Sequence, residues 1–277
     1  MGSPRARRAG RRNTNSELTA RIVIAIPAVA YAIFIVASGG WIFTAGAVLL
    51  GLIALHELFT MYERVRPVRL AGFLATIGLG VAAQLGDERQ VLLAAMALFP
   101  LMFLVNLAAP EGGSTATARM SLTALAVFWV SMAIAHAILL RGLPHGGGII
   151  ILLLVATFVG DTGAYLGGRM FGTRRLAPRI SPNKTVEGLL IGMAAAVFGA
   201  WAAGLYQDWL GHGQALLLGL AVAVVAPLGD LFESQVKRDA GTKDAGRLFG
   251  VHGGALDRLD AAFFALVTGY YVWLAML

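Results

Sequence analysis

The sequence contains no cysteine, and only 13% of its 277 residues are charged. The lack of cysteine excludes disulfides, thiolate metal sites and cysteine nucleophiles. The scarcity of charge excludes an ordinary soluble domain, because such domains carry about 25% charged residues. What the sequence has instead is 58% hydrophobic residues and a mean hydropathy of +0.74. This composition predicts a protein embedded in a membrane.

Nine apolar stretches have lengths near the roughly 20 residues that a membrane helix needs. They lie at about 22–37, 41–59, 70–86, 90–109, 118–140, 147–168, 184–206, 214–232 and 256–275. With the N-terminus in the cytoplasm, twenty of the 22 Lys and Arg residues fall on the cytoplasmic side, leaving only Arg89 and Arg141 outside. By the positive-inside rule, this predicts an all-α polytopic membrane protein of about nine helices, N-terminus cytoplasmic and C-terminus outside.

The arginine-rich residues 1–21 are predicted to form a disordered cytoplasmic tail. A topology anchor that also touches anionic lipid is favoured over an RNA-binding arm, so we expect no nucleic-acid partner. Residues 22–277 show no internal repeat and are interpreted as a single helical membrane domain.

The first half of that domain contains no residue pattern that indicates a reaction. His56 and Glu57 are interpreted as an interfacial helix end with paired charges. His136 stands alone on an apolar stretch, which favours a hydrogen-bonded packing histidine over a ligand. Neither feature points to a reaction.

Acidic residues enter the membrane in the second half. Asp161 and Asp230 each follow a long apolar run, and Asp257 opens the last predicted span. An unpaired aspartate at the centre of a membrane helix costs about 2.5 to 3.5 kcal/mol, so each needs a cation or a Lys or Arg partner. Structural ion pairs are one explanation. The number of acids exceeds what such pairs need, and oxygen ligands without cysteine favour Mg²⁺ over zinc.

A basic segment over 169–188 precedes the seventh predicted span. Pro182 cannot lie inside a helix, so Asn183 or Ser181 is predicted to cap a helix that begins around Lys184. The free N–H groups of such a helix start favour an anion, which Lys184 and Thr185 would also contact. A cytoplasmic loop that merely obeys the positive-inside rule would also be basic.

Three motifs in this half resemble those of the phosphatidate cytidylyltransferases, also called CDP-diacylglycerol synthases. The long one reads Ser234-x-Val236-Lys237-Arg238, four residues, Lys243-Asp244-x-Gly246, and then His252-Gly253-Gly254-x-x-Asp257-Arg258-x-Asp260. The upstream ones are Asp161-Thr-Gly-Ala-Tyr165 and Ser181-Pro-Asn-Lys-Thr-Val-Glu-Gly188. The resemblance covers about residues 157–262, which we take as the catalytic part. Gly250-Val251 stands before His252 where the family usually has proline and glycine.

The resemblance implies transfer of CMP from CTP to phosphatidate, giving CDP-diacylglycerol and pyrophosphate. It implies a Mg²⁺ site on Asp230 and Asp257, supported by Asp161 and Asp260, with room for a second cation. The catalytic residues would be Asp230, Asp257, Lys237, Arg238 and Lys243. The substrate-binding residues would be Ser181, Lys184, Thr185, Ser234, Asp244, His252, Gly253, Gly254 and Arg258. The implied protein is a homodimer in the bacterial inner membrane, with its active site facing the cytoplasm.

Three other kinds of function are weighed against this one. A related CTP-dependent transferase or kinase would act on an isoprenoid lipid instead of phosphatidate. An ion-coupled transporter would also carry acids in its membrane helices. The charges here cluster at one face with no acidic relay reaching the outer half, which favours the enzyme over the transporter. A non-catalytic scaffold would have no use for dense Lys, Asp and Gly motifs.

Overall fold

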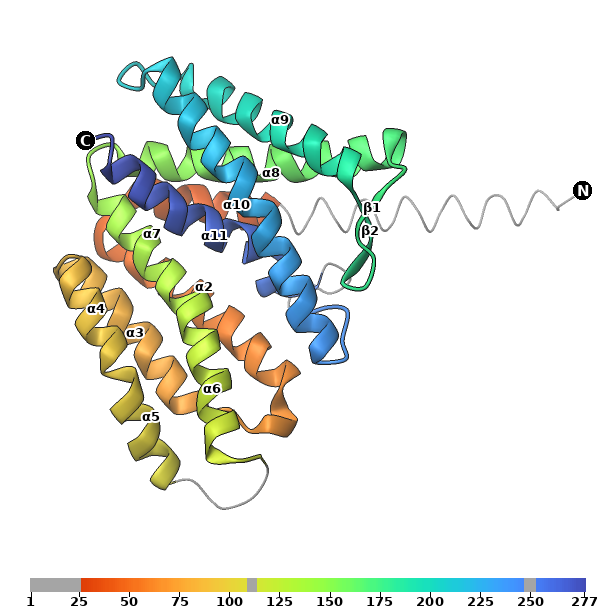
Figure 1. Cartoon of the computed structure of the whole chain (residues 1–277). Helices are drawn as coiled ribbons and strands as arrows, with labels where there is room; N and C mark the ends of the chain where they lie inside the picture. Colours follow the sequence, from red (N-terminus) through yellow and green to blue (C-terminus); the bar gives the residue numbers. More distant parts are fainter. Residues whose placement is uncertain (1–25, 109–113, 247–252) are drawn as a thin grey trace, which may run out of the picture.

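The computed structural model describes residues 26–108, 114–246 and 253–277, and most of these belong to helices (Figure 1). A first helix spans Ile26–Ser38. The others are α2 (Gly40–Met61), the short η1 (Glu63–Val65), α3 (Arg69–Leu85), α4 (Glu88–Met96), α5 (Leu98–Leu107), α6 (Ala116–Ala126), the π-helical η2 (Val127–Ser131), α7 (Met132–Gly142), α8 (Gly146–Phe171), α9 (Val186–Gly204), α10 (His212–Asp239) and α11 (Leu256–Leu274).

Each of the nine apolar stretches contains a helix within the described residues, and the prediction of a helical membrane protein is confirmed. Six segments are long and apolar enough to cross a bilayer: α2, Glu88–Leu107, Ala116–Gly142, α8, α9 and α10. The helix Ile26–Ser38 and α3 are apolar but shorter, and α11 carries Asp257, Arg258 and Asp260 in its first turns. The number of nine spans therefore stays a prediction.

The helices of the second half pack through small residues. Gly160 and Gly163 of α8 face Ala196, Ala195 and Gly192 of α9, which allows the two helix backbones to approach closely. Helix α10 crosses this pair and packs against α11 (Figure 1). As a result, the C-terminal ends of α8 and α10 lie at the same end of the bundle as the N-terminal ends of α9 and α11.

The N-terminal helices pack on the other side of α11, through α2 and α7. His136 of α7 is buried, with Nδ1 2.7 Å from the carbonyl oxygen of Met132 and Nε2 3.0 Å from the hydroxyl of Tyr271 on α11. Both ring nitrogens therefore have partners, and the prediction of a packing histidine is confirmed.

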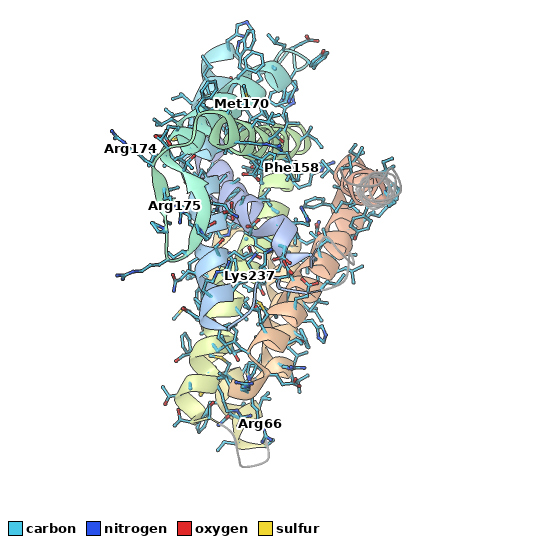
Figure 2. The ribbon with its side chains drawn as sticks, turned by 90° about the vertical axis from the view of Figure 1, so that its right-hand side faces the viewer. Arg66, Phe158, Met170, Arg174, Arg175 and Lys237 are labelled. Atoms are coloured by element: carbon cyan, nitrogen blue, oxygen red, sulfur yellow. The ribbon has the colours of Figure 1, made fainter. Side chains whose placement is uncertain are left out.

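A two-stranded hairpin, which the sequence did not predict, joins α8 to α9. Strand β1 (Arg175–Ala177) pairs antiparallel with β2 (Ser181–Thr185), in the register Arg175 with Thr185 and Ala177 with Ser181. Glu187 holds its base, accepting hydrogen bonds from Thr173 N and Oγ1 (3.0 and 2.6 Å) and from Arg174 N (3.1 Å). Figure 2 shows Arg174 and Arg175 at this hairpin, and both are exposed.

The hairpin corrects the predicted helix cap. Ser181 and Asn183 lie in β2 and do not cap a helix. Helix α9 begins at Val186, and its N-cap is Thr185, whose Oγ1 accepts a hydrogen bond from Gly188 N at 3.1 Å. The strand pairing holds 181–185 in an extended conformation, so the helix starts two residues later than the sequence pattern predicted.

Candidate active site

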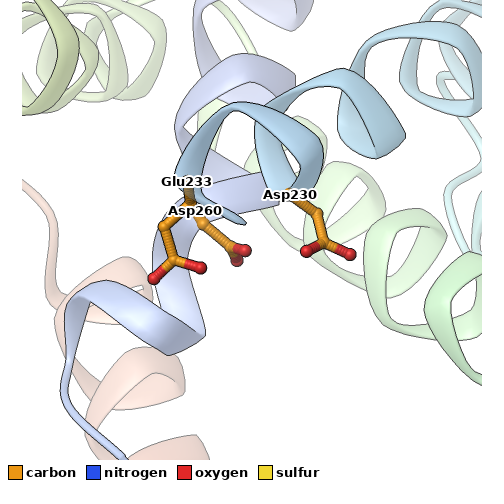
Figure 3. A group of neighbouring side chains, drawn as sticks. All are labelled: Asp230, Glu233 and Asp260. Atoms are coloured by element: carbon orange, nitrogen blue, oxygen red, sulfur yellow. The ribbon is translucent and has the colours of Figure 1, made fainter. Parts of the chain in front are cut away.

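Three carboxylates from two helices meet at the charged end of the bundle. Asp230 and Glu233, three residues apart on α10, lie beside Asp260 of α11, and one oxygen of each lies within 4.8 Å of the others (Figure 3). Glu233 and Asp260 are buried, with 1% and 8% of their surfaces exposed, and Asp230 is partly buried. Grouping acids at such depth is costly unless a positive charge compensates them.

Lys237 supplies part of that positive charge. Its Nζ lies 2.5 Å from Glu233 Oε2 and 2.8 Å from Asp257 Oδ1. The other oxygen of Glu233, Oε1, is buried and has no hydrogen-bond partner among the residues that the structure describes. The group therefore offers oxygen donors beyond those that Lys237 can satisfy, which is the donor chemistry of a hard cation such as Mg²⁺.

Asp257 is not one of the three grouped carboxylates. Besides Lys237, it accepts hydrogen bonds from the backbone N–H groups of Ala245 (3.0 Å) and Gly254 (2.7 Å). Gly253 has a φ of +79°, and a Cβ at this position would overlap the Asp257 carboxylate. In this arrangement Asp257 joins the two described ends of the α10–α11 connection, while Lys237 links it to Glu233.

A cavity of about 570 Å³ opens next to Asp230, between α8, α9, α10 and β2. Its polar lining comprises Thr157, Asp161, Tyr165, Arg169, Ser181, Asn183, Lys184, Thr185 and Asp230. Lys184 forms an ion pair with Asp230. Its apolar lining includes Ala156, Gly160, Gly192, Ala196, Val222 and Ala223. The cavity thus combines a charged portion with an apolar portion between membrane helices.

The remaining residues predicted for the site lie around its rim. Arg238 is exposed and donates from Nε to the carbonyl oxygen of Ile180 in the hairpin at 3.2 Å. Lys243 and Asp244 are exposed on the segment after α10, and Arg258 is exposed in the first turn of α11. Ser234 is partly buried on α10, and Gly254 is buried. His252 and the Gly250-Val251 departure lie outside the described residues.

Two acids of this region were missed by the sequence analysis as site residues. Glu233 was visible only as one of several acids, although its spacing from Asp230 puts both on one helix face. Glu57 was interpreted as part of an interfacial helix end with paired charges, whereas the structure buries its carboxylate against the start of α11. It is 7% exposed, and its Oε2 accepts a hydrogen bond from Leu256 N at 2.9 Å, across 199 residues of sequence. Its position among Leu55, Leu58 and Phe59 is the one local signal of burial.

The site thus combines grouped carboxylates and cations with a partly apolar cavity between the helices of an integral membrane protein. A model of the cytidylyltransferase family matches residues 19–276, and the chain belongs to this family. It is 32% identical to a phosphatidate cytidylyltransferase of Synechocystis in an alignment 284 positions long, which covers 91% of this chain and 95% of that protein. It is 31% identical to the phosphatidate cytidylyltransferase of Mycobacterium tuberculosis over 248 residues (80% of this chain and 73% of that one). With that of Mycobacterium leprae it shares 39% over 154 residues (54% and 48%).

Proposed function

We propose that the protein transfers CMP from CTP to phosphatidate, producing CDP-diacylglycerol and pyrophosphate. The observation that carries this proposal is the cavity, where Lys184, Asp230 and Asp161 adjoin a lining of small apolar residues. A phospholipid substrate has the same division between a charged phosphate and apolar chains. The family match over residues 19–276 and the relatives named phosphatidate cytidylyltransferase support the same reaction.

The proposed reaction requires little proton transfer by the protein. An oxygen of the phosphatidate phosphate attacks the α-phosphorus of CTP, a P–O bond forms there, and the bond to the β-phosphate breaks to release pyrophosphate. The attacking oxygen is already anionic, so the protein needs no strong base. Its main tasks are to position two anions and to offset their charge.

We propose Asp230, Glu233 and Asp260 as the residues that hold Mg²⁺, with Asp161 close by on the cavity wall. The unpartnered Glu233 Oε1, within the described part of the chain, and the all-oxygen donor set support this assignment. When bound, Mg²⁺ would offset negative charge on the phosphate oxygens. Asp257, which the family resemblance places at the metal, would orient Lys237 and the α10–α11 connection, to judge from its bonds here.

The cations around the site have distinct proposed tasks. Lys184, within the cavity, would bind the lipid phosphate or a phosphate of CTP in exchange for its ion pair with Asp230. Lys243, Arg238 and Arg258 lie at the rim, where exposed cations would offset the charge of the leaving pyrophosphate.

We also propose the finer topology: nine spans, N-terminus in the cytoplasm, C-terminus outside, an active site facing the cytoplasm of a bacterial cell membrane, and a homodimer. The distribution of Lys and Arg supports the orientation. Reporter fusions at the C-terminus of the full chain test the orientation, and light scattering of the purified protein tests the dimer.

The direct test of the activity is incubation of purified protein with Mg²⁺, phosphatidate and CTP labelled on its α-phosphate. We expect label in CDP-diacylglycerol and lipid-dependent release of pyrophosphate, both abolished in a folded Asp230→Asn variant. Hydrolysis of CTP that does not depend on lipid would overturn the proposal. In a parallel incubation with CTP labelled on its γ-phosphate, transfer of label to an isoprenoid alcohol would identify a lipid kinase instead.

A further inference from the structure

Glu57 is a buried carboxylate that the proposed reaction does not use. It is the one acid of α2, and its Oε2 accepts the 2.9 Å hydrogen bond from Leu256 N. Leu256 is the first residue of α11, the helix that carries Asp257 and Asp260. A residue of the N-terminal half thus contacts the start of the helix that presents the acids of the site.

The start of α11 needs such an acceptor. The first N–H groups of a helix have no partner within the helix, and a side chain of the N-cap residue usually accepts from them. The N-cap of α11 is Ala255, which has no side-chain acceptor to offer. A carboxylate at this point also interacts favourably with the positive end of the helix dipole. Glu57 therefore takes the part of the capping residue from a different helix.

Two glycines make room for the Glu57 carboxylate. A Cβ on Gly254 would overlap Glu57 Oε2, and a Cβ on Gly246 would overlap Oε1. The preceding Gly253 makes room for Asp257 in the same way. Gly253 and Gly254 of the sequence motif therefore accommodate one carboxylate each, from α11 and from α2.

The end of α2 is attached to α10 as well. The hydroxyl of Tyr62 donates to the carbonyl oxygen of Val236 at 2.9 Å, and Thr242 Oγ1 lies 3.6 Å from Met61 Sδ. Thus the end of α2 and the residue after it contact α10 and the segment that follows α10, while Glu57 contacts the first residue of α11.

We infer that Glu57 is a positioning residue of the active site, which fixes the first turn of α11, and with it Asp257 and Asp260, relative to α10. This inference rests on the proposed cytidylyl transfer. It assigns no contact between Glu57 and a substrate. Its consequence is that loss of the carboxylate displaces reacting groups, and a displacement of about 1 Å can cost roughly 100-fold in rate.

The test compares Glu57→Ala, Glu57→Gln, Gly254→Ala and the double variant Glu57→Ala/Gly254→Ala with the wild type. The control is Glu63→Ala, because Glu63 is an exposed acid just beyond α2, its side chain 77% exposed. The full-length proteins are purified in detergent, and kcat and KM for CTP are measured well below the Tm of each. Hydrogen exchange of the 253–260 amides is measured by mass spectrometry on the same samples.

We expect kcat of Glu57→Ala to decrease about 10- to 100-fold, with a smaller change in KM. Glu57→Gln keeps one oxygen acceptor, so its kcat should lie between that of Glu57→Ala and that of the wild type. The added methyl group of Gly254→Ala overlaps Glu57, so it should also lower kcat about tenfold or more. The double variant should be no worse than Glu57→Ala alone, because the overlap is then gone. The inference would be overturned if the fold-loss of kcat in the double variant equalled the product of the two single losses, or if kcat of Glu57→Ala were unchanged.

Hydrogen exchange separates this inference from the proposed reaction. The amide of Leu256 should exchange faster in Glu57→Ala and at the wild-type rate in Glu63→Ala. If the wild type transfers no CMP, the proposed function fails, while the exchange result still decides whether Glu57 caps α11. Unchanged exchange in Glu57→Ala would overturn the capping contact even if CMP transfer is confirmed.

Discussion

Replacement of Lys237 by methionine tests the charge balance of the site. Methionine is also unbranched and fills most of the same space, but it carries no charge. Lys237 is the ammonium partner of both Glu233 and Asp257, at 2.5 and 2.8 Å. The variant leaves these two carboxylates without that partner.

The size of the effect follows from burial. The side chains of Lys237, Glu233 and Asp257 are 15%, 1% and 10% exposed, so water compensates little of the charge. Removing one partner of a buried ion pair costs about 3 to 5 kcal/mol, because an unpaired buried charge remains. For a chain of this size, that corresponds to a fall in Tm of roughly 6 to 20 °C.

Thermal unfolding of the purified variant, followed by intrinsic fluorescence in a chelating buffer, measures this change. Arg238→Met is the matched control, because Arg238 is the next residue, is exposed, and should cost under about 1 kcal/mol. A second substitution, Glu233→Gln, should recover part of the lost Tm by removing one of the two charges. A Tm of Lys237→Met within about 2 °C of the wild type would refute the reasoning, since it corresponds to less than about 1 kcal/mol.

Three further predictions concern the hairpin and the metal. Thr185→Val should lower the free energy of unfolding by about 1 kcal/mol, because it removes the hydroxyl that caps α9. Thr185→Ser keeps a hydroxyl and should retain the wild-type stability. Equal Tm values for the two variants would contradict the cap. Glu187→Ala should raise KM for phosphatidate in mixed micelles about fivefold or more, which is equivalent to about 1 kcal/mol. The reason is that the base of the hairpin loses the carboxylate that accepts its hydrogen bonds. An unchanged KM would argue against the hairpin as a wall of the lipid site. Chelation by EDTA should stop CMP transfer and added Mg²⁺ should restore it; activity that persists in EDTA would refute the metal role of Asp230, Glu233 and Asp260.

The helices were predictable, but their exact ends and the hairpin were not. Long apolar runs must form helices in a bilayer, because the backbone polar groups find partners nowhere else. Pro182 excluded a helix interior at its own position, and a helix cap was the local explanation for Ser181 and Asn183. The pairing of Arg175 with Thr185 instead depends on two segments meeting across a turn, which hydropathy does not encode.

For the site, the family resemblance and the acids at the ends of apolar runs pointed to Asp230 and Asp260, which the structure brings together with Glu233. Helix periodicity relates residues three or four apart, and so it could have added Glu233 to this group. It could not have added Glu57, because the partner of this residue lies 199 positions away on another helix. Asp257 shows the same limit, since the sequence does not reveal whether a carboxylate faces a metal or backbone N–H groups.

The contact between Glu57 and Leu256 bears on how separable the two halves of the chain are. A fragment comprising α8 to α11 would contain every sequence motif of the proposed site, yet the first N–H of α11 would lack the acceptor that α2 provides. We therefore expect such a fragment to be inactive even if it inserts into the membrane. Chimeras between members of this family should tolerate exchange of the halves only when one parent supplies a glutamate at the position of Glu57 and the other supplies glycines at the positions of Gly246 and Gly254.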